Sequence, residues 1–146
     1  MMARQHAALF PVLKELNIGF VAFSPMANGF LTGAYGKGER FDAKTDYRAS
    51  MPQFTDEAVE KNRSLLKLLA DLADVHSATP AQISLAWMID CAEHIVPIPG
   101  SRKPERMREN LGAADIELSA AEIAEIDAAL DGMEMSEVFG GTPLKK

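Results

Sequence analysis

The stretch Ile95–Asn110, IVPIPGSRKPERMREN, joins a short, mostly apolar run to a strongly basic segment. Its first four residues predict a short buried strand. A Pro-Gly-Ser turn follows, and Pro104 can open a helix because proline is favoured at the first helical position. Four cations lie within seven residues of this junction: Arg102, Lys103, Arg106 and Arg108. The stretch therefore predicts a strand that leads directly into a cationic helix start.

A helix start is suited to anions, because its first backbone N–H groups are unpaired and it carries a partial positive charge. Ser101 can donate a hydroxyl hydrogen bond, and Arg102 and Arg106 can make forked contacts to a phosphate. Lys103 supplies a mobile charge, and Gly100 lets the backbone approach closely. The junction predicts a phosphate site, and a solvated basic helix end is the alternative that these residues leave open.

Outward from this junction, helical patterns alternate with one further apolar run. Ile18–Phe23, IGFVAF, has the length and continuous hydrophobicity of a strand buried on both faces, as in a parallel sheet. Apolar spacing and capping signals predict helices at Gln5–Leu16, Thr55–Val75, Thr79–Cys91 and Pro104–Leu111, and after Ser119. Helices separated by single strands indicate an α/β fold. Two parallel strands make a poor independent domain, so the sequence predicts a piece of a larger fold.

The first expected strand also leads into a glycine-rich loop, FSPMANGFLTGAYGKG at Phe23–Gly38. It is not a P-loop, because Gly36-Lys37 is followed by Gly38 and not by serine or threonine. It does not match the dinucleotide fingerprint either, because the third glycine of that motif is missing. The loop continues to Phe54, and so long a connection is usually functional or disordered. Within it, the segment 46–48 is expected either to cover a ligand or to be solvated. The glycine-rich loop and the basic junction each follow a strand. Together they suggest the phosphate-binding loops that follow the last two strands of (β/α)8 barrels.

Composition narrows the classes of function. The 146 residues suit one domain, and the net charge of -6 argues against general binding to nucleic acid or an anionic membrane. No secretory pattern is present, and no window approaches the roughly 20 apolar residues of a membrane span. Cys91 is the single cysteine, which excludes an internal disulfide and fits the cytoplasm. The histidines lack metal-ligand spacing, so no metal site is expected.

Three stretches resemble the C-terminal part of an aldo-keto reductase: Ile18–Tyr35, Ala78–Ile89 and Ile95–Asp127. The resemblance implies the C-terminal segment of a (β/α)8 TIM barrel, with two parallel strands and several helices. Residues 1–146 would form one partial domain, and its strands would be the seventh and eighth of the barrel. It also implies an NADPH-dependent oxidoreductase that reduces a small-molecule carbonyl to an alcohol by hydride transfer.

The resemblance also assigns residues to NADP(H) by motif position. The residues expected to bind it are Ser24, Met26, Asn28, Gly29 and Leu31 after the first strand, and Pro99, Gly100, Ser101, Arg102, Lys103, Arg106, Glu109 and Asn110 after the second. The first group would line the pyrophosphate. In the second group, residues 101–103 and Arg106 would take the adenosine 2′-phosphate, and residues 109–110 would address the adenine. Some family members carry lysine in place of Gly100, so in this chain the 2′-phosphate would depend on the residues that follow.

The resemblance further implies that catalytic residues are missing. The family's catalytic Asp, Tyr, Lys and His come from earlier strands and loops, and this chain is expected to begin at the end of strand six. Tyr35 and Tyr47 are not expected to replace the missing acid, so the chain alone is expected to be inactive. The alternatives are a non-catalytic binding or self-assembly fragment, which pairs exposed strands with a second copy or a missing N-terminal half, and a remnant without function. The tail, 133–146, has no clear period.

Overall fold

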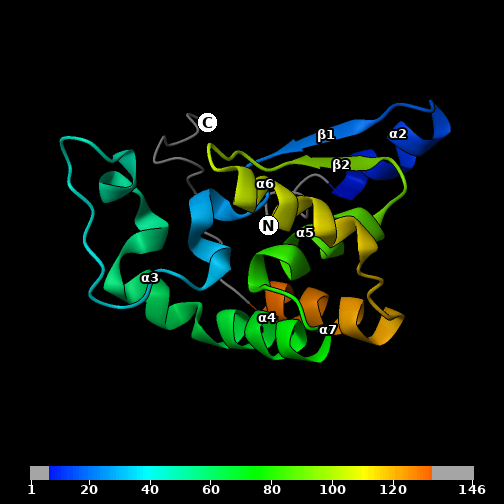
Figure 1. Ribbon diagram of the computed structural model, residues 1–146. Coiled ribbons are helices and arrows are strands. Elements are labelled where there is room, and N and C mark those ends of the chain that lie inside the picture. Colours follow the sequence, from blue (N-terminus) through cyan, green and yellow to red (C-terminus); the bar gives the residue numbers. More distant parts are fainter. Residues whose placement is uncertain (1–6, 133–146) are drawn as a thin grey trace.

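The computed structural model describes residues 7–132 (Figure 1). The start of the first expected helix, at Gln5, and the tail lie outside the described residues. The α-helices are α2 (Phe10–Glu15), α3 (Asp56–Lys61), α4 (Arg63–Val75), α5 (Pro80–Cys91), α6 (Pro104–Leu111) and α7 (Ala120–Asp131). The strands are β1 (Phe20–Phe23) and β2 (Ile95–Ile98), and the 3-10 helices are η1 (Ala7–Leu9), η2 (Ala27–Thr32), η3 (Tyr47–Ser50), η4 (Pro52–Phe54) and η5 (Gly112–Asp115).

The two strands pair in parallel, with Phe20 opposite Ile95 at the start of the ladder. This confirms the predicted parallel pair. One face of the sheet is covered, because Ala22 and Ile95 are each only 6% exposed. The prediction of burial on both faces is wrong: Val21 and Val96, on the opposite face, are 62% and 55% exposed. The reason is that the helices of the described residues gather on one side of the sheet (Figure 1).

The hydrophobic core lies among α4, α5 and α7. Ile83 of α5 is fully buried, and Leu65 and Leu69 of α4 are 1% and 2% exposed. Both predicted capping boxes are present, at Thr79 before α5 and at Ser119 before α7. In each, the capping side chain accepts from the backbone N–H three residues later. The side chain of that later residue accepts from the backbone N–H of the capping residue, so these free N–H groups of the helix start have acceptors nearby. No helix within residues 7–132 has the length and apolar character needed to span a membrane.

The predicted continuous helix Thr55–Val75 is wrong, because the chain breaks it into α3 and α4 at Asn62. Thr55 does cap α3, and its Oγ1 accepts from the Ala58 N–H at 3.2 Å. Asn62 leaves helical geometry with φ -95° and ψ 6°, and its Nδ2 donates to the Ala58 carbonyl at 2.6 Å. The asparagine amide thus takes a helical carbonyl as its acceptor, which favours a break in the helix.

The long loop after β1 is folded rather than disordered. It contains three 3-10 helices and an aromatic cluster in which the rings of Phe41 and Phe54 meet edge to face at 4.9 Å. Tyr35 packs against both rings, at 5.3 Å from Phe41 and 5.7 Å from Phe54. Phe30 belongs to the same hydrophobic cluster as Phe54, and its side chain is only 3% exposed. Burial of these rings explains how a loop of this length holds one conformation.

Candidate functional site

The two predicted cofactor-binding segments leave the sheet side by side. Phe23 and Ile98 are partners at the ends of their parallel strands, so the chains that continue at Ser24 and Pro99 start as neighbours. Ligands of α/β folds commonly bind beyond the carboxyl ends of parallel strands. The pairing therefore brings the beginnings of both predicted segments to one edge of the sheet.

The segment after β1 has an unusual backbone. Ala27, Asn28 and Gly29 are consecutive left-handed residues, with φ of 48°, 59° and 93°, and Ser24 also has a positive φ of 49°. Such a conformation costs a non-glycine residue about 1–2 kcal/mol, so it persists only where the surroundings hold it. One anchor is Ser84 of α5, which is 5% exposed and whose hydroxyl donates to the carbonyl of residue 25 at 3.2 Å.

The other two residues predicted in this segment are less open to a ligand. Met26 is half-buried, and its carbonyl accepts from the N–H groups of Gly29 at 3.0 Å and Leu31 at 3.3 Å. Leu31 is 4% exposed and belongs to the hydrophobic core. The place of Leu31 in the loop agrees with the prediction, and its contact with the cofactor stays a prediction.

The basic junction after β2 is exposed, and its cations have no carboxylate partner among the described residues. Arg102, Lys103 and Arg106 are all exposed, and none forms an ion pair with any carboxylate in residues 7–132. Elsewhere in the same part of the chain, cations do find partners, as in the pairs Arg40–Asp56, Arg63–Glu60 and Lys67–Asp71. An acidic protein that leaves neighbouring cations without carboxylates retains a local positive field for an anion.

Backbone geometry at this junction is also open. The residue before α6, Lys103, gives no side-chain cap, and Ser101 Oγ instead accepts from the Lys103 N–H at 3.2 Å. A Cβ at Gly100 would meet no heavy atom within 4 Å, so packing does not require glycine there. Pro99, which precedes it, is half-buried. The first turn of α6 therefore keeps backbone donors that no capping side chain occupies.

The pair predicted to address the adenine lies at the other end of α6. Glu109 Oε1 accepts from the Thr79 hydroxyl at 2.8 Å, and its carbonyl accepts from Gln82 Nε2 at 2.9 Å. These bonds tie α6 to the start of α5. Asn110, next to it, is half-buried. The adenine contacts stay predictions. The hydrogen bonds of Glu109 to the start of α5 could not be predicted from the sequence, because its partners lie about 30 residues away.

The segment 46–48 is held in place by contacts of its side chains. Arg48 hydrogen-bonds the Asp46 carboxylate through Nε at 2.9 Å, and its guanidinium stacks 4.3 Å from the ring centroid of Phe41. The hydrogen bond from Arg48 holds the pKa of Asp46 below its ordinary value. Tyr47 donates its hydroxyl to Asn28 Oδ1 at 3.1 Å, which links the loop to the segment after β1. Sequence reasoning missed this link, since nothing local pairs residues 19 positions apart.

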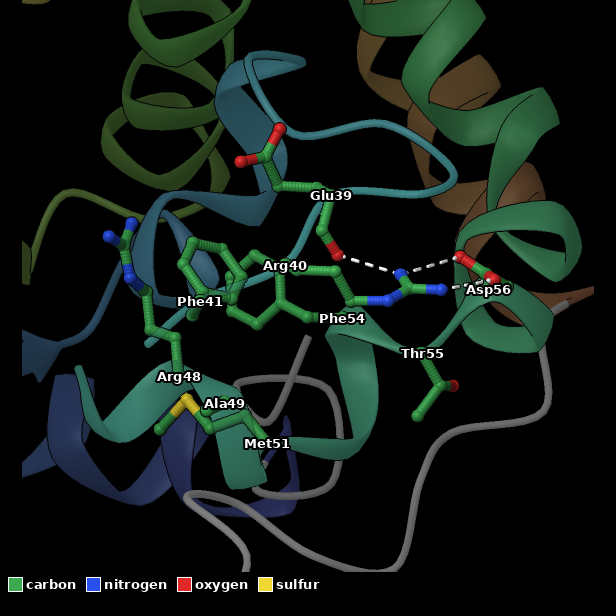
Figure 2. A pocket seen from close by; sticks show the side chains of 9 residues that line it. All are labelled: Glu39, Arg40, Phe41, Arg48, Ala49, Met51, Phe54, Thr55 and Asp56. Atoms are coloured by element: carbon green, nitrogen blue, oxygen red, sulfur yellow. Dashed lines mark hydrogen bonds and ion pairs between the residues drawn. The ribbon is translucent and has the colours of Figure 1, made fainter. Parts of the chain in front are cut away.

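A cavity of about 320 Å³ lies within the long loop and includes none of the predicted cofactor-binding residues. Figure 2 shows its lining: Glu39, Arg40, Phe41, Arg48, Ala49, Met51, Phe54, Thr55 and Asp56. Arg40 faces Asp56 at 2.9 Å, and this hydrogen bond lowers the pKa of Asp56 to about 2. Because Arg40 and Arg48 both have carboxylate partners, the cavity offers a phosphate no unpaired arginine. Across residues 7–132, no group of three or more His, Cys, Asp or Glu could hold a metal ion.

Two parallel strands whose carboxyl ends lie at one edge of the sheet, followed by a basic junction before α6, are typical of an α/β fold. The profile of the aldo/keto reductase family matches residues 1–131, and the chain belongs to that family. It is 33% identical over 150 residues to aldo-keto reductase yakc [NADP(+)] of Schizosaccharomyces pombe (strain 972 / ATCC 24843), covering 96% of this chain and 44% of the relative. It is 35% identical over 133 residues to probable aldo-keto reductase 1 of Glycine max, covering 91% and 37%. The chain thus spans less than half the length of these relatives.

Solved structures agree with the fold. The glycerol dehydrogenase AKR11B4 from Gluconobacter oxydans superposes with a TM-score of 0.73 at 20% identity, covering 93% of this chain and 39% of that one. The thermostable aldo-keto reductase Tm1743, solved with the inhibitor epalrestat, gives 0.58 at 24% identity, covering 86% and 34%. At these identities the likeness concerns the fold alone, and it confirms the prediction of an α/β segment of a TIM barrel.

Proposed function

We propose that this chain carries the NADP(H)-binding part of an oxidoreductase that reduces a small-molecule aldehyde or ketone to an alcohol. The observation that carries the proposal is the basic junction, in which Arg102, Lys103 and Arg106 form no ion pair within residues 7–132, next to the strained segment after β1. The name of the fission-yeast relative, which specifies NADP(+), supports the same cofactor for this chain.

The residues present fit a dinucleotide phosphate. The two exposed arginines offer planar forks that match the oxygens of a 2′-phosphate, and Lys103 adds a third charge. On the neighbouring segment, Asn28 Nδ2 is buried and has no hydrogen-bond acceptor among the described residues. A buried donor without a partner costs about 1–3 kcal/mol, and a phosphate oxygen of the pyrophosphate would satisfy it. Donors on the two segments thus match the pyrophosphate and the 2′-phosphate of the cofactor.

In this proposal the chain binds and orients the cofactor, and no residue of it is assigned to proton transfer. NADPH supplies the hydride when bound. The carbonyl substrate, the turnover and the cytoplasmic location are proposed for the whole protein, since this chain covers 44% of the fission-yeast relative. The exposed sheet face with Val21 and Val96 would then receive the preceding strands of the barrel.

Titration of the 146-residue chain with NADPH and NADH, followed by cofactor fluorescence, tests the proposal. We expect tighter binding of NADPH, competition by adenosine 2′,5′-bisphosphate, and weaker competition by 5′-AMP. An aromatic aldehyde should not be reduced above background. Equal affinity for the two cofactors would count against recognition of the 2′-phosphate. Turnover would show that this chain holds catalytic groups.

A second candidate function, self-assembly, is favoured by the exposed sheet face. Val21, Val96 and Ile98 are 62%, 55% and 51% exposed, and β1 and β2 pair only with each other in residues 7–132. Exposed strand edges readily pair with another chain. In this alternative, two copies pair their exposed strand edges and cover each other's exposed sheet face, without catalysing a reaction. The mass of the purified chain in solution tests it.

A further inference from the structure

Residues 24–32, directly after β1, are contacted at two points by a later part of the same long loop. The Tyr47 hydroxyl donates to Asn28 Oδ1 at 3.1 Å. The ring of Tyr35 lies against Gly29 so closely that a Cβ on that glycine would be 3.1 Å from Tyr35 Cε2. Asn28 and Gly29 are left-handed residues, at φ 59° and 93°. The later part of the loop therefore contacts the segment in its left-handed stretch, where the backbone conformation costs free energy.

Arg48 connects the two contacts. Its guanidinium stacks 4.7 Å from the centroid of Tyr35, the residue that packs on Gly29. The backbone N–H of Arg48 and its Nε also both donate to Asp46 Oδ1, at 3.0 Å and 2.9 Å, which fixes the start of η3. Because Tyr47 lies between these two residues, the same ion pair holds the backbone from which the Tyr47 side chain extends. Asp46 and Arg48 have side chains 24% and 23% exposed, so the pair is largely shielded from water.

The Tyr47 hydroxyl holds the Asn28 side chain in place. Asn28 Oδ1 accepts from the hydroxyl at 3.1 Å, and Asn28 Nδ2 is buried without an acceptor in the described residues. A tyrosine hydroxyl can both donate and accept, so the contact would persist if the amide exchanged its oxygen and nitrogen. The contact therefore fixes the position of the Asn28 side chain and, through it, the left-handed backbone at Asn28.

We propose that Tyr47, held by Arg48, is a positioning residue that holds Asn28 and the left-handed segment after β1 in place for the cofactor pyrophosphate. The proposal rests on the proposed function, because it assumes that the segment after β1 binds a dinucleotide. The Tyr47–Asn28 contact is formed without ligand, so it reduces the cost of ordering the segment on binding. The pyrophosphate is common to NADPH and NADH, and the contact therefore serves both cofactors equally.

Tyr47→Phe tests the proposal, since it removes the hydroxyl and keeps the ring. Tyr47 is 66% exposed, so the unfolding midpoint should barely move. We expect NADPH and NADH to bind about 3- to 10-fold more weakly, with an unchanged ratio between them. Hydrogen exchange of the amides in residues 24–32 should become faster without cofactor. Thr45→Val is the matched control, because its hydroxyl bonds Asp42 in the same loop and does not touch the segment.

A double-mutant cycle with Asn28→Ala completes the test. If Tyr47 acts through Asn28, the second substitution adds little to the first, and additive losses would overturn the proposal. Unchanged exchange and unchanged affinities in Tyr47→Phe would also overturn it, even where NADPH preference persists and the proposed function stands. If the unaltered chain binds neither cofactor, the proposed function fails and this proposal fails with it.

Discussion

Val21 and Val96 are direct partners in the parallel ladder, and both side chains are more than half exposed on the same face of the sheet. Adjacent apolar side chains of this size are normally buried, at about 25 cal/mol per Å² of surface removed from water. Exposed apolar patches are typical of interaction surfaces. Both candidate functions, part of a barrel and a self-assembling fragment, use this face.

Val96→Asp is expected to weaken self-association of the chain. Two sheets that pack face to face would bring buried carboxylates together, and each would lose its hydration. Sedimentation equilibrium of the purified variant measures the change. Val75→Asp is the control, because Val75 is 72% exposed at the end of α4, away from the sheet. Identical association in the unaltered chain and both variants would contradict assembly through this face.

Arg102→Ala and Arg106→Ala are each expected to weaken NADPH binding by about 1–3 kcal/mol, because each removes a charge-assisted contact to the 2′-phosphate. NADH, which lacks that phosphate, should bind almost as before. Fluorescence titration with both cofactors gives the comparison. Arg63→Ala removes an exposed arginine that pairs with Glu60 at 2.8 Å, and it should change neither affinity. Equal losses for the two cofactors would speak against the 2′-phosphate role.

Gly100→Lys is expected to increase the preference for NADPH over NADH by about 3- to 10-fold, since it adds a cation beside the basic junction. The position has room for the new side chain, because a Cβ there meets nothing within 4 Å. The thermal unfolding midpoint should therefore stay close to that of the unaltered chain. Gly100→Gln, similar in length and uncharged, is the control. A preference that rises equally in both variants would exclude charge as the cause.

Acid stability is expected to depend on Glu122. Hydrogen bonds from the Ser119 side chain and backbone, then from His76, lower the pKa of Glu122 from its ordinary 4.5 to about 2. The unfolded chain therefore binds more protons between these values, and the stabilisation is complete above pH 4.5 and lost as pH falls towards 2. Glu122→Gln should flatten this part of the curve in urea unfolding.

Glu125→Gln, on an exposed position of the same helix, is the control for this pH dependence. It should keep the acid limb of the stability curve as it is in the unaltered chain. If Glu122→Gln also keeps that limb, the stabilisation comes from another group.

Several features followed from local sequence because each depends on residues close together. Thr79 and Ser119 cap their own helices through partners three residues away, so spacing alone was enough. The run before the basic junction became β2 at the predicted residues, Ile95–Ile98. Parallel pairing followed from single strands between helices, since such connections favour that topology. Assignment of the cofactor residues needed the family resemblance, and their ligand contacts remain predictions.

Tertiary structure decided what depends on residues distant in the chain. The break at Asn62 and the exposure of Val21 were not predicted, because helical spacing does not show a competing side-chain bond and hydrophobicity does not show which face is covered. The Tyr47–Asn28 hydrogen bond joins positions 19 residues apart, and Arg48, next to Tyr47, packs against the rings of Tyr35 and Phe41. Local sequence thus determined the helix starts that carry their own caps, at Thr55, Thr79 and Ser119, and long-range packing determined which side chains contact the segment after β1.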